Sequence, residues 1–121
     1  MPRLRIDGDD LVVTLSALEQ LAAFRFGDVR VPLSSITDVA VEPDAWAALR
    51  GIRAPGTGIP GVIAYGTRRH RGGRDFALVR GGHRPGLRID LEAPAPYSRL
   101  VLTVADPQEQ AKLVSRAQRG P

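Results

Sequence analysis

Hydrophobic and polar residues alternate with a period of two along much of the chain, which is the pattern of half-buried β-strands. Near the start, the apolar positions of 4–6 and 11–15 flank an Asp7-Gly8 turn, so we predict a β-hairpin. Pro32 indicates that its strand lies at a sheet edge or is bulged. Further strands are predicted at 28–33, 36–42, 62–67, 74–80, 87–91 and 98–104.

A short helix is predicted after the first hairpin. Ser16 with Glu19 three residues later forms a capping box that opens a helix over 17–24. Its apolar residues, Leu18, Leu21 and Ala22, are expected to be buried against the strands.

Two later helical segments begin at aspartates. Asp44 is expected to cap a single turn over 45–50, with Trp46 largely buried beside Leu49. Asp106 followed by Pro107 opens a last helix, because proline suits the first helical position. Its narrow apolar stripe is too small to be stable alone, so the helix must dock on the sheets. The stripe consists of Ala111, Val114 and Ala117.

The segment 51–61 is rich in glycine and proline, which together occupy six of its eleven positions. Such a run is typical of a shaped loop between ordered parts of the chain. It contains a G-x-G-x-x-G pattern, but proline interrupts the pattern and a β-prone run follows, so a dinucleotide site is disfavoured. We therefore keep two interpretations, a loop packed across the sheets and a binding loop. The candidate binding residues are Gly56, Thr57 and Gly58.

Length and composition indicate one domain over residues 1–121, with 43% hydrophobic residues and no cysteine. The absence of cysteine excludes disulfides and thiolate zinc sites. No run approaches eighteen apolar residues, and the N-terminus has no signal-peptide pattern, so we expect a cytoplasmic protein.

The net charge of +4 comes almost wholly from arginine, because Lys112 is the single lysine. Arginine suits bidentate contact with phosphate or carboxylate, although codon bias in a GC-rich genome gives the same excess. Within residues 68–84, six arginines stand against one acid, Asp75. If adjacent hairpin turns bring them to one end of the fold, they form an anion or partner site; otherwise they are solvated turn residues. The candidates are Arg68, Arg69, Arg71, Arg74 and Arg84.

Catalysis finds little support in the sequence. His70 and His83 lie in arginine-rich, turn-like segments, and neither has a metal-ligand partner at helical or hairpin spacing. We predict no metal, no cofactor and no enzymatic activity.

The segment Val29-Arg-Val-Pro-Leu-Ser-Ser-Ile-Thr-Asp-Val39 resembles the strand, Pro-Leu-Ser, strand signature of bacterial pleckstrin-homology-like (PH-like) domains. Most of the chain is similar to small actinobacterial proteins of that type, whose function is unassigned. The resemblance implies two nearly orthogonal sheets, a C-terminal helix across an open corner, and binding of phospholipid headgroups, peptides or proteins. The early helix and the segment 51–61 depart from the seven-strand pattern.

These observations predict a mostly β fold, an antiparallel barrel or two-sheet PH-like domain with one early helix and a capping C-terminal helix. We expect a non-enzymatic binding or scaffold module with a protein partner, bound at the sheet edge near Pro32 or at segment 51–61. The alternative is an anion-binding module that uses the arginines of 68–84 on a lipid headgroup or nucleic acid. Homo-oligomerisation stays open.

Overall fold

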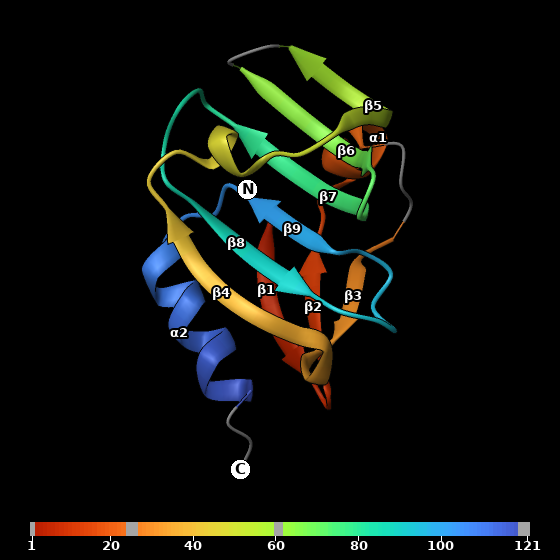
Figure 1. Cartoon of the computed structure of the whole chain (residues 1–121). Coiled ribbons are helices and arrows are strands. Elements are labelled where there is room, and N and C mark those ends of the chain that lie inside the picture. Colours follow the sequence, from red (N-terminus) through yellow and green to blue (C-terminus); the bar gives the residue numbers. More distant parts are fainter. Residues whose placement is uncertain (1, 24–26, 60–61, 119–121) are drawn as a thin grey trace.

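The computed structural model describes residues 2–23, 27–59 and 62–118, and for residues 52–57 it describes the backbone alone. The strands form a three-stranded sheet of order β1-β2-β3 and a six-stranded sheet of order β4-β8-β9-β7-β6-β5 (Figure 1). The first contains β1 (Arg3–Asp7), β2 (Asp10–Thr14) and β3 (Val29–Pro32). The second contains β4 (Ile36–Glu42), β5 (Ile52–Ile59), β6 (Ile63–His70), β7 (Gly73–Arg80), β8 (Gly86–Leu91) and β9 (Arg99–Leu102). The helical elements are α1 (Ala17–Ala22), η1 (Leu33–Ser35), η2 (Ala45–Ala48) and α2 (Pro107–Gln118).

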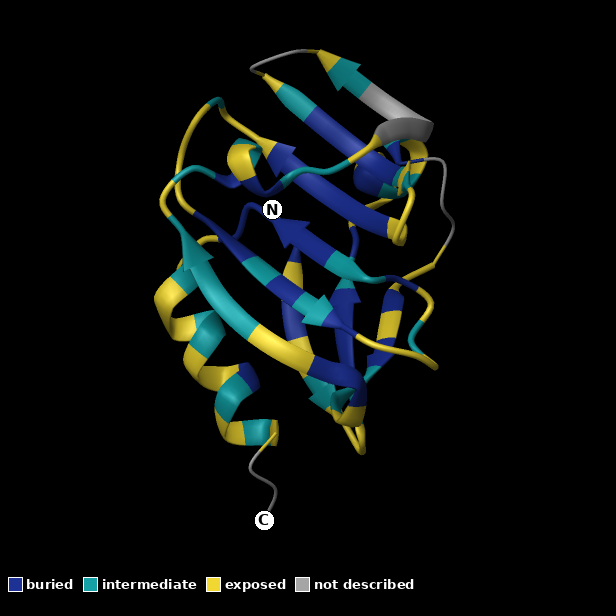
Figure 2. Ribbon diagram, viewed as in Figure 1, coloured by how far each residue is buried: buried dark blue, intermediate teal, exposed yellow. Residues whose placement is uncertain are grey.

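The two sheets pack face to face around one main core, which Figure 2 shows as buried positions on the facing strands. The small sheet contributes Leu11 and Val13, and the large sheet contributes Leu78, Ile89 and Leu100. The prediction of a mostly β, two-sheet fold is confirmed. The alternative of a barrel is wrong, because in the described part of the chain β4 pairs only with β8 and β5 only with β6, which leaves open edges.

The large sheet has one parallel pair, which the expectation of an antiparallel fold did not include. β9 lies between β8 and β7, antiparallel to the first and parallel to the second. The chain leaves β7, forms β8 two strand positions away, and returns as β9 to fill the position between them. Because β8 runs opposite to β7, the strand that follows it back runs in the direction of β7.

The first helix forms where it was predicted, but the face that it buries is not the predicted one. Ser16 and Glu19 make the reciprocal capping box, with Ser16 Oγ accepting from Glu19 N and Glu19 Oε1 accepting from Ser16 N. The box buries Glu19, and Ala22 packs on the core, so Leu18 and Leu21 on the opposite side are 73% and 65% exposed. The prediction that these leucines are buried is wrong, because capping fixes the orientation of so short a helix. The predicted end of the helix at residue 24 lies outside the described residues.

The glycine- and proline-rich segment is a strand over most of its length. β5 lies at the edge of the large sheet and pairs with β6, with a register shift between Arg53 and Gly56. An edge strand needs hydrogen bonds on one side only, so it tolerates proline. Gly51, just before β5, has φ +73°, and a Cβ there would lie 2.1 Å from the carbonyl oxygen of Arg69. The predicted loop is thus corrected to an edge strand, while Pro60 and Gly61 lie outside the described residues.

The C-terminal helix matches its prediction. Asp106 Oδ1 accepts a hydrogen bond from Glu109 N at 3.2 Å, which caps the first turn. Val114 is fully buried in the main core and Ala111 packs against it, so α2 lies along β4 and β8 (Figure 1). No helix in the described ranges is long and apolar enough to cross a membrane.

The docking of α2 predicts a contrast between two adjacent positions. Val114→Ala should lower the free energy of unfolding by about 2 kcal/mol, because it removes two buried methyl groups and leaves a small cavity. Leu113 is 37% exposed, so Leu113→Ala should change it by less than about 0.5 kcal/mol. Urea unfolding followed by circular dichroism measures both, and equal effects would contradict the docking of α2 through Val114.

Candidate functional site

A buried carboxylate organises the polar face of the large sheet. Asp75 on β7 has a side chain that is 1% exposed, and Arg50 donates to its two oxygens from Nε and Nη2 at 2.8 Å each. This charge-assisted pair raises the pKa of the Arg50 guanidinium above its usual range. His70 Nε2 lies 2.9 Å from Asp75 Oδ1, while His70 Nδ1 accepts from Gly72 N at 3.1 Å. The second contact makes Nδ1 an acceptor, so Nε2 carries the proton that faces Asp75.

The same sheet face carries a second set of ion pairs on β4, β8 and β9. Arg88 donates from Nε to Glu42 Oε1 at 2.6 Å and also pairs with Asp38 and Asp90. Its hydrogen bond to Glu42 is the main cause that raises the pKa of Arg88. Arg99 bonds Asp90 at 2.6 Å and the carbonyl of Ala48 at 3.0 Å. These arginines hold strands and η2 together and are neutralised within the fold.

The arginines predicted as a binding site differ from this set. Five arginines of residues 68–84 have no described carboxylate within 4.0 Å of their guanidinium groups. Asp75, the one acid of residues 68–84, is paired with Arg50. All five are exposed. They are the predicted Arg69, Arg71, Arg74 and Arg84, together with Arg80 of the same stretch. Arg68 instead has a structural part, since it donates to the carbonyls of Arg50 and Gly51 at 3.1 and 2.9 Å.

The fold divides these arginines between the two ends of β7. The β6–β7 turn consists of Arg71 and Gly72 alone, because the strands extend to His70 and from Gly73. Arg69, Arg71 and Arg74 therefore lie at the start of β7, whereas Arg84 lies in the loop after its other end. Adjacent hairpin turns therefore do not bring all of these arginines to one end, because consecutive turns of a hairpin series alternate between the ends of the strands.

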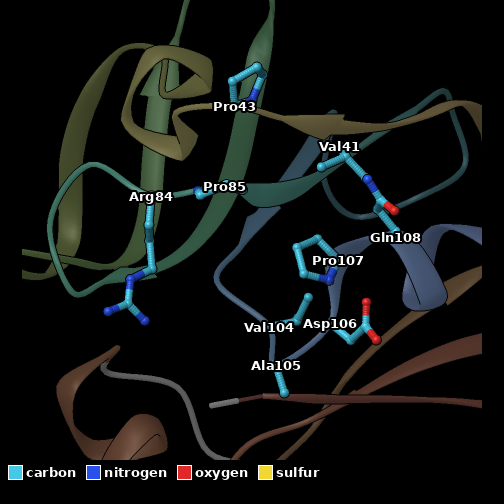
Figure 3. A pocket seen from close by; sticks show the side chains of 9 residues that line it. All are labelled: Val41, Pro43, Arg84, Pro85, Val104, Ala105, Asp106, Pro107 and Gln108. Carbon is cyan, nitrogen blue, oxygen red and sulfur yellow. The ribbon is translucent and has the colours of Figure 1, made fainter.

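A groove lies beside Arg84, where the end of β4, the β7–β8 loop and the start of α2 meet (Figure 3). Its volume is about 720 Å³, within the range usual for ligand pockets. The apolar part of the lining includes three prolines, and the polar part consists of Arg84, Asp106 and Gln108. The apolar residues are Val41, Pro43, Pro85, Val104, Ala105 and Pro107.

Hydrogen bonds fasten one wall of the groove. Ala45 N donates to the carbonyl of Arg84 at 3.0 Å, and Trp46 Nε1 donates to the carbonyl of Gly82 at 3.0 Å. Asp44 Oδ2 lies 2.8 Å from His83 Nδ1. We call these three contacts the clasp. It holds the β7–β8 loop against η2, so Arg84 is presented from a fixed backbone.

The clasp also explains the exposure of Trp46. This residue was predicted to be largely buried, but it is only partly buried. It packs with Leu49 on a small cluster around Val79 and Val101, on the outer face of the sheet. Its indole nitrogen must reach the carbonyl of Gly82, which keeps one edge of the ring near the surface.

The remaining candidates lie apart from the groove. The backbone places Gly56, Thr57 and Gly58 in β5, opposite Gly66, Tyr65 and Ala64 of β6. His70 ends β6 and His83 lies in the β7–β8 loop, so the two histidines are at opposite ends of β7, each beside one aspartate. In the described ranges, no three His, Asp or Glu side chains are grouped so as to hold a metal ion.

Sequence reasoning missed the groove and the Arg50–Asp75 pair. The prolines at 43, 85 and 107 each stand at the end of a predicted element, which is the one signal that pointed to the groove. The pairing of Arg50 with Asp75 joins residues 25 positions apart, and no local pattern marks it.

The chain matches no protein-family model, no curated protein and no solved structure.

The buried pair predicts a large effect at Arg50. Arg50→Met should lower the free energy of unfolding by about 3 kcal/mol, because the buried carboxylate of Asp75 loses its cationic partner. Arg69→Met removes the same charge from an exposed position and should change stability by less than about 0.5 kcal/mol. Chemical denaturation of both variants tests the difference, and a small effect at Arg50 would show that His70 alone satisfies Asp75.

Proposed function

We propose that the protein is a non-enzymatic binding module that holds an extended segment of a partner protein in the groove beside Arg84. The observation that carries the proposal is an apolar groove with one exposed arginine that no described carboxylate neutralises. The proposed binding surface thereby differs from the two predicted from the sequence, which were the sheet edge near Pro32 and segment 51–61. A cytoplasmic location belongs to the same proposal, as does a PH-like relationship, which the two sheets and the C-terminal helix support.

The lining favours an apolar ligand with little loss of entropy on binding. Proline side chains have no rotamer freedom to lose, and three of them, Pro43, Pro85 and Pro107, form walls of the groove. The clasp holds the loop that carries Pro85 and Arg84. A preformed site of this kind loses little conformational entropy when a ligand binds.

The charges define the orientation of the ligand. Asp106 Oδ1 is already engaged in capping α2, so the charged group of the groove that makes no described hydrogen bond is the Arg84 guanidinium. A partner segment therefore fits best with apolar residues against the prolines and a carboxylate beside Arg84, where a bidentate pair can form.

An array of immobilised random octapeptides, probed with the purified chain, tests the proposal. We expect the bound peptides to share apolar residues next to an Asp, a Glu or a free C-terminus. Binding in solution is followed by the fluorescence of Trp46, the single tryptophan, because its indole is bonded to the loop that carries Arg84. Arg84→Gln should weaken binding at least roughly tenfold, since the charge-assisted pair with the ligand carboxylate is lost.

Two variants provide a matched comparison. Ala105→Phe places a ring in the groove and should abolish binding, whereas Ala47→Phe adds the same ring at an exposed position of η2, outside the groove, and should not. If the array retains no peptide, or if Ala105→Phe binds as well as the wild type, the groove is not the binding site.

A further inference from the structure

The β6–β7 hairpin places two like charges directly opposite one another. Arg69 on β6 and Arg74 on β7 are register partners near the end of the hairpin. Both lie on the sheet face that carries the buried Thr67 and Phe76 further along the strands, because residues two apart point to the same side. Like charges in directly opposite positions destabilise a strand pair, so this arrangement has a local cost.

A third arginine completes the group. Arg71 occupies the two-residue turn between the strands and is exposed, as are Arg69 and Arg74. We call these three residues the hairpin arginines. Within the described part of the chain, none has a carboxylate within salt-bridge distance, in contrast to Arg50, Arg88 and Arg99 of the same sheet.

One of the three is already oriented by the fold. Arg74 Nε donates to the carbonyl of Pro96 at 2.9 Å, and its guanidinium carbon lies 5.2 Å from the centre of the Tyr97 ring. Tyr97 is buried and its ring lies 5.4 Å from that of Phe76, so the surface under Arg74 is fixed. These contacts use Nε and leave the two terminal nitrogens of Arg74 as donors.

We propose that the hairpin arginines form a binding site for a phosphate-type dianion, such as a phosphate monoester. A tetrahedral dianion accepts hydrogen bonds from several guanidinium groups at once, and its attraction to both side chains offsets the repulsion between Arg69 and Arg74. Local rules of this kind are broken mainly at functional or strained sites. The site lies at the end of β7 away from the groove, so it goes beyond the proposed function.

The phosphate group has two possible sources, a small free molecule or a lipid headgroup. The exposed leucines of α1, Leu18 and Leu21, bear on this choice, because α1 contacts β6 and lies beside its C-terminal end (Figure 1). A lipid headgroup held by the hairpin arginines would bring these leucines to the bilayer surface. A free phosphate would leave them in water.

The first experiment uses glycerol 3-phosphate and inorganic phosphate at low salt, followed by NMR of the Gly72 and Gly73 amides and the arginine Nε–H groups. We expect a dissociation constant on the order of 1 mM, which a few exposed charge-assisted hydrogen bonds provide. Arg69→Gln together with Arg71→Gln should raise it at least about tenfold. Added sodium chloride should weaken binding, because exposed charges are screened.

The control is Arg80→Gln together with Arg84→Gln. This variant loses the same charge from the opposite end of β7, at two exposed arginines that also lack a described carboxylate partner. It should bind phosphate as the wild type does while impairing the groove, so the two proposals fail separately. The control variant should melt as the wild type does, since exposed charges contribute little to stability. The hairpin variant should melt at the same temperature or slightly higher, because it relieves the repulsion between Arg69 and Arg74.

The second experiment uses phosphatidylcholine vesicles with and without phosphatidic acid, which carries a phosphate monoester. Binding that depends on phosphatidic acid and falls in Leu18→Ala/Leu21→Ala assigns the site to a lipid headgroup. Binding of glycerol 3-phosphate without binding to vesicles assigns it to a free molecule. The proposal is overturned if neither probe binds at up to about 50 mM phosphate, well above the expected constant, or if the control variant loses as much affinity as the hairpin variant.

Discussion

The buried carboxylate of Asp75 is the constraint on which the polar half of the molecule depends. A carboxylate removed from water requires charged or hydrogen-bonding partners, and Arg50 and His70 supply them. Because Arg50 precedes β5, this pairing fixes the point at which the edge strand begins, and Arg68 reinforces it through the carbonyls of Arg50 and Gly51. It also removes the one acid that is close in sequence to the hairpin arginines, which leaves them without a counter-ion in the described part of the fold.

The groove depends on a different constraint, the close approach of η2 to the large sheet. A Cβ at Gly86 would lie 2.7 Å from the Ala45 side chain and 2.9 Å from the Leu102 carbonyl, so only glycine lets η2 come this near to β8. That approach brings the β7–β8 loop within reach of Ala45 and Trp46, which fasten it. The insertion of β9 between β8 and β7 then delivers the start of α2 to the same corner, and Pro107 faces Pro85 and Pro43 across the groove.

Sequence reasoning succeeded where a few neighbouring residues decide the outcome. The hairpin at Asp7-Gly8, the capping box of Ser16 and Glu19, and the cap at Asp106 are all formed within four residues, and the structure has each of them. It failed where distant segments compete. The segment 51–61 has the composition of a loop, but pairing with β6 makes it a strand, and the burial of Glu19 turned the leucines of α1 outward. The local hydrophobic pattern of the sequence shows neither the strand nor the outward direction of the leucines.

The placement of the arginines could not be predicted from local sequence either. Residues 68–84 carry their charges within one short stretch of sequence, yet β7 alone extends over eight residues, or roughly 25 Å at about 3.3 Å per residue. A single small anion cannot bridge that length, so Arg84 and the hairpin arginines act as separate sites for any small ligand. Only a partner larger than the strand can contact both ends. β7 is paired with β6 along its whole length and with β9 over its middle four residues, so its backbone holds the two sites at a fixed spacing.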